Sequence, residues 1–143
     1  MKAENYIKLE FPARSVNEGF ARAAAAAFVS QLDPTLTELG DIKTAVSEAV
    51  TNAVVHAYPE EIGVVQLRLR ILPGGELEIM VKDRGAGIPD VERARTPLYT
   101  TGGDDRSGMA FTIMEGFMDK LRVRSIPGRG TTVTMRRKLQ RRG

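Results

Sequence analysis

The sequence contains no cysteine, which excludes disulfide bonds and thiolate metal sites. It lacks an apolar run near the roughly 18 residues that a membrane-spanning helix needs. Its first residues, MKAENYIKLEF, lack the apolar segment of a signal peptide. These absences predict a cytoplasmic protein. No repeat or long linker interrupts the 143 residues, so we expect a single domain over residues 1–143.

Two common nucleotide-binding signatures are also missing. There is no G-x-x-x-x-G-K-[ST], which excludes a P-loop protein, and no G-x-G-x-x-G, which excludes the dinucleotide and protein-kinase loops. His56 is the only histidine. A kinase that phosphorylates its own histidine would carry that residue on a separate dimerisation helix, and none is predicted. We therefore expect a structural role for His56 near the rim of a pocket.

Charge of neither sign dominates. There are 21 basic and 18 acidic residues, giving a net charge of +3. Basic residues concentrate in the C-terminal RRKLQRRG, where a solvated tail and a nucleic-acid contact are both possible. The mixed signs elsewhere favour the solvated tail. With 42% hydrophobic residues, the composition is that of a globular domain.

The spacing of apolar residues predicts five strands and three principal helices. Alternation predicts strands at 6–11, 64–72, 76–83, 121–126 and 131–139. Helices are predicted from Ser15, with Glu18 completing a capping box, to Leu32, and at 35–58 and 109–119. This order predicts a two-layer α/β sandwich, with helices on one face of a mixed, mostly antiparallel sheet.

Three short stretches carry residues that suit chemistry. Glu48 and Asn52 share one stripe of a predicted helix whose other residues are so apolar that we expect burial on nearly all sides. Asp83 opens D-R-G-A-G after a strand, where glycines allow close approach of a flat ligand and the carboxylate can accept from a base amine. Ser107-Gly108 opens the third helix, whose free N–H groups suit phosphate.

Each stretch alone has a simpler interpretation. The Asp-Gly stretch is commonly only a turn, Ser-Gly only a helix cap, and Glu48 with Asn52 a satisfied core pair. Several polar groups pointing the same way in one small domain weaken the last alternative. Their occurrence together and in this order favours a nucleotide site.

The order and spacing of these motifs resemble the GHKL ATPases, which include DNA gyrase, Hsp90 chaperones, two-component histidine kinases and mismatch-repair ATPases. Their ATP site is the Bergerat fold, also a two-layer α/β sandwich. The stretches LDPT, VSEAVTNAVVHAY, PLYTT, SGMAFTIME and GRGTTV resemble, over nearly the whole chain, the anti-sigma serine kinases of spore-forming bacteria. The resemblance implies a homodimer that inhibits a sporulation sigma factor. It also implies Mg-ATP-dependent phosphorylation of a serine on an anti-anti-sigma factor.

The resemblance implies roles for residues at the two ends of an ATP site. Glu48 matches the general base that takes the proton of the incoming serine hydroxyl, and Asn52 matches the Mg²⁺ ligand. Asp83 matches the residue that binds the adenine amine, and Thr131 completes the base pocket. Gly85 and Gly87 match residues that shape the wall of the adenine pocket.

Residues 97–108 match the ATP lid of this family. Contacts to the nucleotide are expected from Thr100, Thr101, Ser107, Gly108 and Met109. Arg106 matches an arginine that stabilises charge on the γ-phosphate, with a solvated loop arginine as the alternative. Ala110 stands where the common pattern has a second glycine, and we expect a helix there to tolerate it.

Arg22 matches an arginine that contacts both the sigma factor and the anti-anti-sigma factor, against the simpler interpretation of a solvated helix arginine. Two other functions remain open. One is a non-catalytic module whose affinity for a sigma factor is gated by nucleotide, although a pure sensor does not need a base at Glu48. The other, an ATPase domain of a chaperone or topoisomerase, would need transducer domains that 143 residues cannot contain.

Overall fold

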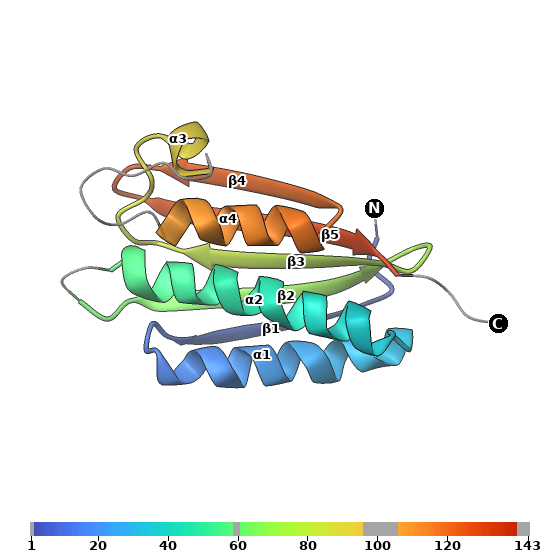
Figure 1. The fold of residues 1–143 in the computed structure, drawn as a ribbon. Coiled ribbons are helices and arrows are strands. Elements are labelled where there is room, and N and C mark those ends of the chain that lie inside the picture. Colours follow the sequence, from blue (N-terminus) through green and yellow to red (C-terminus); the bar gives the residue numbers. More distant parts are fainter. Residues whose placement is uncertain (1, 59–60, 96–105, 140–143) are drawn as a thin grey trace.

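The computed structural model describes residues 2–58, 61–95 and 106–139, with the backbone alone at 106–108 (Figure 1). In chain order the elements are β1 (Asn5–Pro12), α1 (Val16–Val29), the 3-10 turn η1 (Ser30–Leu32), α2 (Leu36–His56), β2 (Val64–Leu72), β3 (Glu76–Asp83), α3 (Val91–Arg95), α4 (Arg106–Phe117), β4 (Lys120–Ile126) and β5 (Gly130–Lys138). Among these helices, none combines the length and the apolar character needed to cross a membrane.

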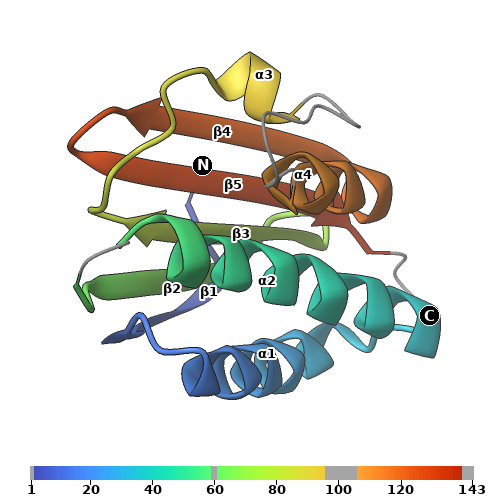
Figure 2. The same ribbon diagram turned by 60° about the vertical axis from the view of Figure 1, so that its left-hand side comes forward.

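The predicted two-layer sandwich is confirmed. The five strands form one sheet in the order β1-β2-β3-β5-β4, and α1, α2 and α4 cover one of its faces (Figures 1 and 2). Every strand pair of the described sheet is antiparallel, so the expected parallel component is absent there. The reason is topological: β3 and β4 run in the same direction, but β5 inserts between them and pairs with both.

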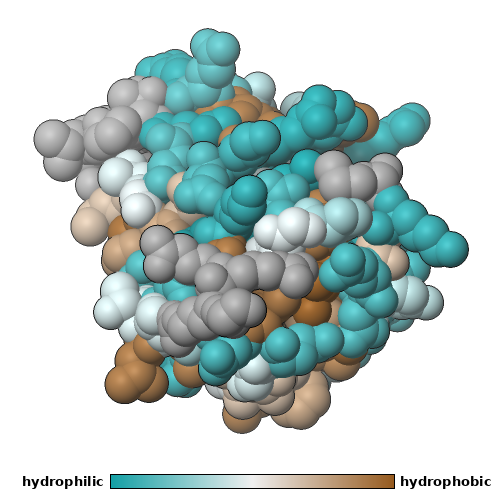
Figure 3. All heavy atoms as spheres, turned by 90° about the vertical axis from the view of Figure 1, so that its right-hand side faces the viewer, coloured by the Kyte–Doolittle hydropathy of each residue, from teal (hydrophilic) through white to brown (hydrophobic). Residues whose placement is uncertain are grey.

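The core lies between the sheet and the helices. Ile42, Val46 and Val50 of α2 are fully buried, as are Leu67 and Ile79 on the strands beneath. Burying one such side chain contributes about 1.5–3 kcal/mol, so this layer fixes α2 firmly on the sheet. The face of the molecule in Figure 3 is mostly hydrophilic, with apolar side chains in separate patches between the polar ones.

The predicted capping box at Ser15 is wrong, and a box forms one helix later. Ser15 already has helical dihedrals (φ −59°, ψ −31°) and its side chain makes no cap bond. At α2, the Glu38 N–H donates to the Thr35 hydroxyl at 2.9 Å, and the Glu38 carboxylate accepts from the Thr35 N–H at 2.8 Å. The Thr-x-x-Glu spacing carries the same signature, and the extended dihedrals of Thr35 allow it to cap.

Helix boundaries differ modestly from the sequence expectations. The first helix gives way to the turn η1 after Val29, and Asp33 then adopts the left-handed conformation (φ 51°), which stops the helix. The last helix begins at Arg106 rather than 109. Helix α3 was not predicted, because its five residues are too few for helical periodicity to be visible.

Candidate nucleotide-binding site

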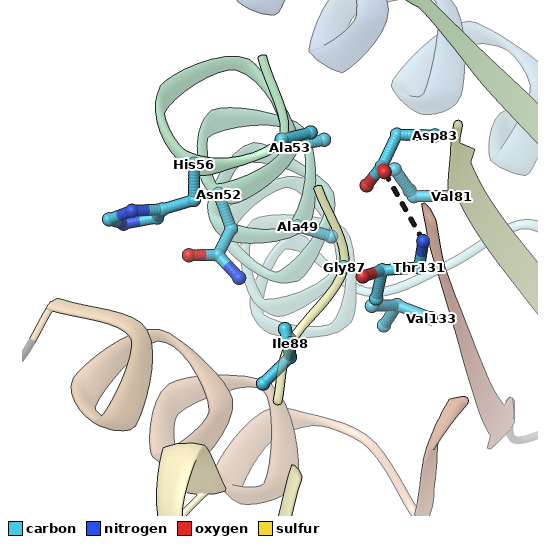
Figure 4. Close-up of a pocket in the computed structure, with 11 residues that line it drawn as sticks. Ala49, Asn52, Ala53, His56, Val81, Asp83, Gly87, Ile88, Thr131 and Val133 are labelled. Atoms are coloured by element: carbon cyan, nitrogen blue, oxygen red, sulfur yellow. Dashed lines mark hydrogen bonds between the residues drawn. The ribbon is translucent and has the colours of Figure 1, made fainter. Parts of the chain in front are cut away.

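Two adjoining hollows lie along α2. The first, of about 400 Å³, is bordered by α2, the end of β3, the start of β5, and the loop after β3. It is lined by Ala49, Asn52, Ala53, His56, Ala57, Val81, Asp83, Gly87, Ile88, Thr131 and Val133 (Figure 4). The second, of about 560 Å³, lies between α2 and α4 and is lined by Glu48, Thr51, Asn52, Val55, His56, Met109, Ala110 and Ile113. Both volumes include space that is open to solvent.

The polar stripe of α2 connects the two hollows. Asn52 and His56 line both, whereas Glu48 lines only the second. The small side chains of Ala49 and Ala53 form the floor of the first hollow, which is why the helix can approach the sheet and still leave space. The expectation of a helix buried on nearly all sides is wrong, since Glu48 and Asn52 are partly exposed. That face of α2 meets the hollows instead of packed protein.

Asp83 is a buried polar group of the first hollow, held by backbone hydrogen bonds. It ends β3 and is 7% exposed. Its Oδ1 accepts two backbone hydrogen bonds, from the N–H of Gly85 at 2.9 Å and of Thr131 at 3.2 Å. Burial raises the pKa of the Asp83 carboxyl, and those two N–H groups oppose the rise. Because both N–H groups bind Oδ1, Oδ2 is left as an acceptor for a ligand donor.

The two glycines of D-R-G-A-G are required for different reasons. Gly87 lines the first hollow and has φ 77°, and a Cβ there would lie 2.5 Å from the carbonyl oxygen of Ile126. Gly85 does not line that hollow. A Cβ on Gly85 would lie 2.0 Å from the carbonyl oxygen of Ala57, so glycine is needed for packing against the end of α2. Packing against α2 therefore explains why residue 85 is a glycine. The contact between Gly85 and the nucleotide stays a prediction.

Tyr58 and Ser125 hold the base end together, and sequence reasoning missed both. The Tyr58 hydroxyl donates to the Val64 carbonyl at 2.7 Å and accepts from the Arg84 N–H at 2.8 Å, which ties the end of α2 to β2 and to the turn after β3. The Ser125 hydroxyl accepts from the N–H of Ile88 at 2.6 Å. Tyr58 ends the VSEAVTNAVVHAY stretch and Ser125 lies outside the stretches that carry the resemblance, but neither role could be predicted, because their backbone partners come close only on folding.

His56 is placed at the rim, as expected. It lines both hollows at the C-terminal end of α2, and its ring points away from Asp83 (Figure 4). Asn52 instead directs its amide from α2 toward the loop that holds Gly87 and Ile88 (Figure 4). These two neighbours on one stripe therefore point in different directions, and the structural role expected for His56 stays a prediction.

The predicted phosphate-binding residues are only partly placed. Met109 is 56% exposed and lines the second hollow opposite Glu48. Ala110 is helical and buried, which agrees with the expectation that a helix tolerates alanine there. The backbone at Arg106, Ser107 and Gly108 is the first turn of α4. Thr100 and Thr101 lie outside the described residues.

Arg22 lies apart from both hollows. It is on α1, its side chain is 45% exposed, and its Nε lies 3.7 Å from the carboxylate of Glu18 in an i,i+4 pair. An exposed pair of this kind contributes little stability, about 0.3–0.5 kcal/mol. Its position is therefore that of a surface residue, and not of a group that acts on nucleotide.

Within the part of the chain that the structure describes, no cluster of three or more His, Cys, Asp or Glu side chains could hold a metal ion. A divalent ion at this site would take most of its ligands from phosphate oxygens and water. Asn52 fits such an arrangement, because its amide faces into the site where the two hollows meet (Figure 4). An amide oxygen together with phosphate and water oxygens is a normal shell for Mg²⁺.

Comparisons with known proteins identify the family. Residues 11–137 match the histidine kinase-like ATPase domain family. The chain is 57% identical over 138 residues to an anti-sigma F factor of Pasteuria penetrans, covering 95% of this chain and 92% of that protein. It is 53% identical over 138 residues to an anti-sigma F factor of Clostridium novyi, covering 95% and 96%.

Solved structures agree on the fold. The RsbU and RsbW domains of a Mycobacterium tuberculosis protein align with a TM-score of 0.69 at 22% identity, over 96% of this chain and 32% of that one. The histidine kinase domain of a blue-light activated kinase from Erythrobacter litoralis aligns with a TM-score of 0.57 at 26% identity, over 97% and 65%. The domain is a nucleotide-binding ATPase of the kinase type. The chain belongs to the histidine kinase-like ATPase family and, within it, to the anti-sigma F factors.

Proposed function

We propose that this protein binds and inhibits a sporulation sigma factor of the sigma F type, and that it phosphorylates a serine of the anti-anti-sigma factor opposing it. Residues 1–143 would act as one ATP-binding kinase domain. The relatives support this function, because curated proteins 49–57% identical over nearly the full chain carry the name anti-sigma F factor. The observation that carries it is the placement of Glu48, Asn52 and Asp83 around two adjoining hollows.

The first hollow would hold the adenine base. Asp83 offers Oδ2 as an acceptor for the exocyclic amine, and Thr131 adds a hydroxyl beside it. Gly87 brings the backbone close to the base without a side chain in the way. A site built to hydrogen-bond one particular donor rejects ligands that lack it, because its own buried polar group would stay unpaired.

The second hollow would hold the phosphates and the attacking serine. Asn52 would bind Mg²⁺, which would supply charge neutralisation on the phosphate oxygens. Glu48 would accept the proton of the serine hydroxyl, and Arg106 would stabilise charge on the transferred group. The helix N-terminus at Ser107, Gly108 and Met109, with Thr100 and Thr101, would complete the phosphate contacts. In such sites catalysis comes mostly from positioning and charge stabilisation.

Partner binding would use the exposed side of α1. Arg22 is exposed on that helix, and Phe20 (61% exposed) and Val16 (76% exposed) share a different side of it at i,i+4 spacing. We propose that Arg22 contacts the sigma factor and the anti-anti-sigma factor, and that the protein acts as a homodimer.

The test has two arms that use purified full-length protein. In the first, immobilised protein with Mg-ATP should retain a sigma factor of the sigma F type and release it when unphosphorylated anti-anti-sigma factor is added. In the second, labelled γ-phosphate should appear on a serine of that factor, and chelation of Mg²⁺ should abolish the transfer. Retention of the sigma factor without any transfer would leave a non-catalytic, nucleotide-gated module, and no retention would refute the anti-sigma function.

A further inference from the structure

Ser125 lies directly behind the base end of the site. It is on β4, opposite Thr131 in the register of β4 and β5. Its Oγ accepts from the N–H of Ile88 at 2.6 Å and lies 2.8 Å from Oγ1 of Thr131. Ile88 and Thr131 both line the first hollow, whereas Ser125 does not. One hydroxyl behind the wall therefore contacts two parts of the wall.

The hydrogen bonds of Ser125 decide what Thr131 can present to a ligand. A hydroxyl has one proton and two acceptor lone pairs, and the N–H of Ile88 occupies one lone pair of Ser125. The Ser125 proton has two acceptors, the Gly130 carbonyl at 3.2 Å and Oγ1 of Thr131 at 2.8 Å. If it goes to Gly130, Thr131 donates back to Ser125 and offers only lone pairs to the hollow. If it goes to Thr131, the Thr131 proton is released for a ligand.

Asp83 supplies the acceptor in the pair of hydrogen-bonding groups that the site presents to the base. Its Oδ1 accepts two backbone N–H groups, so the ionised carboxylate presents Oδ2 to the hollow as an acceptor only. Adenine carries an amine donor at C6 next to the acceptor N1, whereas guanine carries a carbonyl acceptor next to a protonated N1. An acceptor at Asp83 beside a donor at Thr131 matches adenine and opposes guanine.

We propose that Ser125 is a positioning residue that turns the Thr131 hydroxyl into a donor toward N1 of adenine, and thereby raises the preference of the site for ATP over GTP. This inference rests on the proposed function, because it takes an adenine nucleotide as the ligand. Ser125 acts through Thr131 and does not touch the base itself, in agreement with its place outside the lining of the hollow.

The test removes one hydrogen-bonding atom from the protein and one from the ligand. Dissociation constants are measured by calorimetry for ATP, GTP and 1-deaza-ATP, in which a C–H replaces N1. Ser125→Ala removes the donor that commits the Thr131 proton to the ligand and leaves the Thr131 hydroxyl free to rotate. ATP binding should therefore weaken about threefold, and the ratio of ATP to GTP affinity should fall. The same change should alter 1-deaza-ATP binding less than about twofold, because that ligand has no acceptor to lose.

Three further variants complete the test. Ser125→Thr keeps a hydroxyl at this position and should restore wild-type affinity for ATP. Ser125→Cys keeps the shape with only a weak donor, and should give the alanine pattern even if the alanine variant fails to fold. Ser30→Ala is the matched control, since the Ser30 hydroxyl donates to the Ala26 carbonyl at 2.9 Å at the far end of α1. It should change no affinity.

Two results would overturn the inference and leave nucleotide binding intact. If Ser125→Ala weakens the binding of ATP and of 1-deaza-ATP equally, Ser125 only shapes the wall of the hollow through Ile88. If Ser125→Ala leaves the affinity for ATP unchanged, Ser125 neither orients Thr131 nor shapes the wall. If the wild-type protein binds neither ATP nor 1-deaza-ATP, the proposed ATP site itself is refuted, and this outcome is distinct from the other two.

Discussion

The two ends of the site are built differently. At the base end, Asp83 is buried and held by backbone N–H groups from two segments, while Tyr58 and Ser125 tie the surrounding loops with further hydrogen bonds. At the other end, Glu48 and Met109 are partly or largely exposed side chains on two helices that face each other across a hollow. Among the described residues, hydrogen bonds therefore hold the proposed base pocket in place before any ligand binds, whereas the proposed phosphate end presents partly exposed side chains.

The largest expected effect separates chemistry from binding. Glu48→Gln keeps the size of the side chain but removes the base, so phosphate transfer to the anti-anti-sigma factor should fall about 10²–10⁴-fold. ATP affinity should change less than about threefold, since Glu48 lines only the second hollow. Single-turnover transfer and equilibrium binding measure the two quantities, and a large loss of ATP affinity would contradict the division into two ends.

Asp83→Asn should give the opposite pattern. The amide cannot present an ionised acceptor to the adenine amine, so ATP affinity should fall about tenfold to a hundredfold. The protein without nucleotide should keep its thermal stability, because the variant no longer has to bury a carboxylate. Calorimetry and thermal unfolding check these outcomes. If the variant is unfolded in the absence of ATP, Asp83 is required for folding as well as for any contact with the ligand.

The raised pKa of Asp83 predicts a pH dependence with two signs. ATP binding needs the ionised carboxylate, so affinity should fall as the pH drops through that raised pKa. Stability without nucleotide runs the other way. A raised folded-state pKa contributes stability that is complete below the unfolded value of about 3.9 and is lost as pH rises through the folded value. In urea unfolding from pH 4 to 7, the free energy of unfolding of Asp83→Asn should therefore rise relative to that of the wild type as the pH rises.

The smallest effect concerns the ties around the base pocket. Tyr58→Phe removes the hydroxyl between the Val64 carbonyl and the Arg84 N–H, and should lower the free energy of unfolding by about 1–2 kcal/mol. Tyr6→Phe, at a side chain that is 59% exposed, is the control and should change stability by less than about 0.5 kcal/mol. Equal effects in urea denaturation would mean that the tie at Tyr58 does not hold the pocket.

Much of the fold followed from local patterns. Alternating apolar residues located all five strands, and the helical spacing located α1, α2 and α4 to within a few residues. The parallel component and the Ser15 capping box were wrong for related reasons. Strand order depends on β5 entering between β3 and β4, and a capping serine must hold extended dihedrals. Neither the strand order nor these dihedral angles can be predicted from the spacing of residues along one element.

The sequence by itself located the residues proposed to form the site, because Glu48, Asn52 and Asp83 stand in motifs that together resemble those of a known family. Only the tertiary structure decided how the site is held. Gly85 packs on the end of α2, and Ser125 contacts Ile88 and Thr131 across two strands and a loop. These contacts join segments up to 37 positions apart, and hydrogen bonds to backbone groups leave no side-chain signature in the sequence.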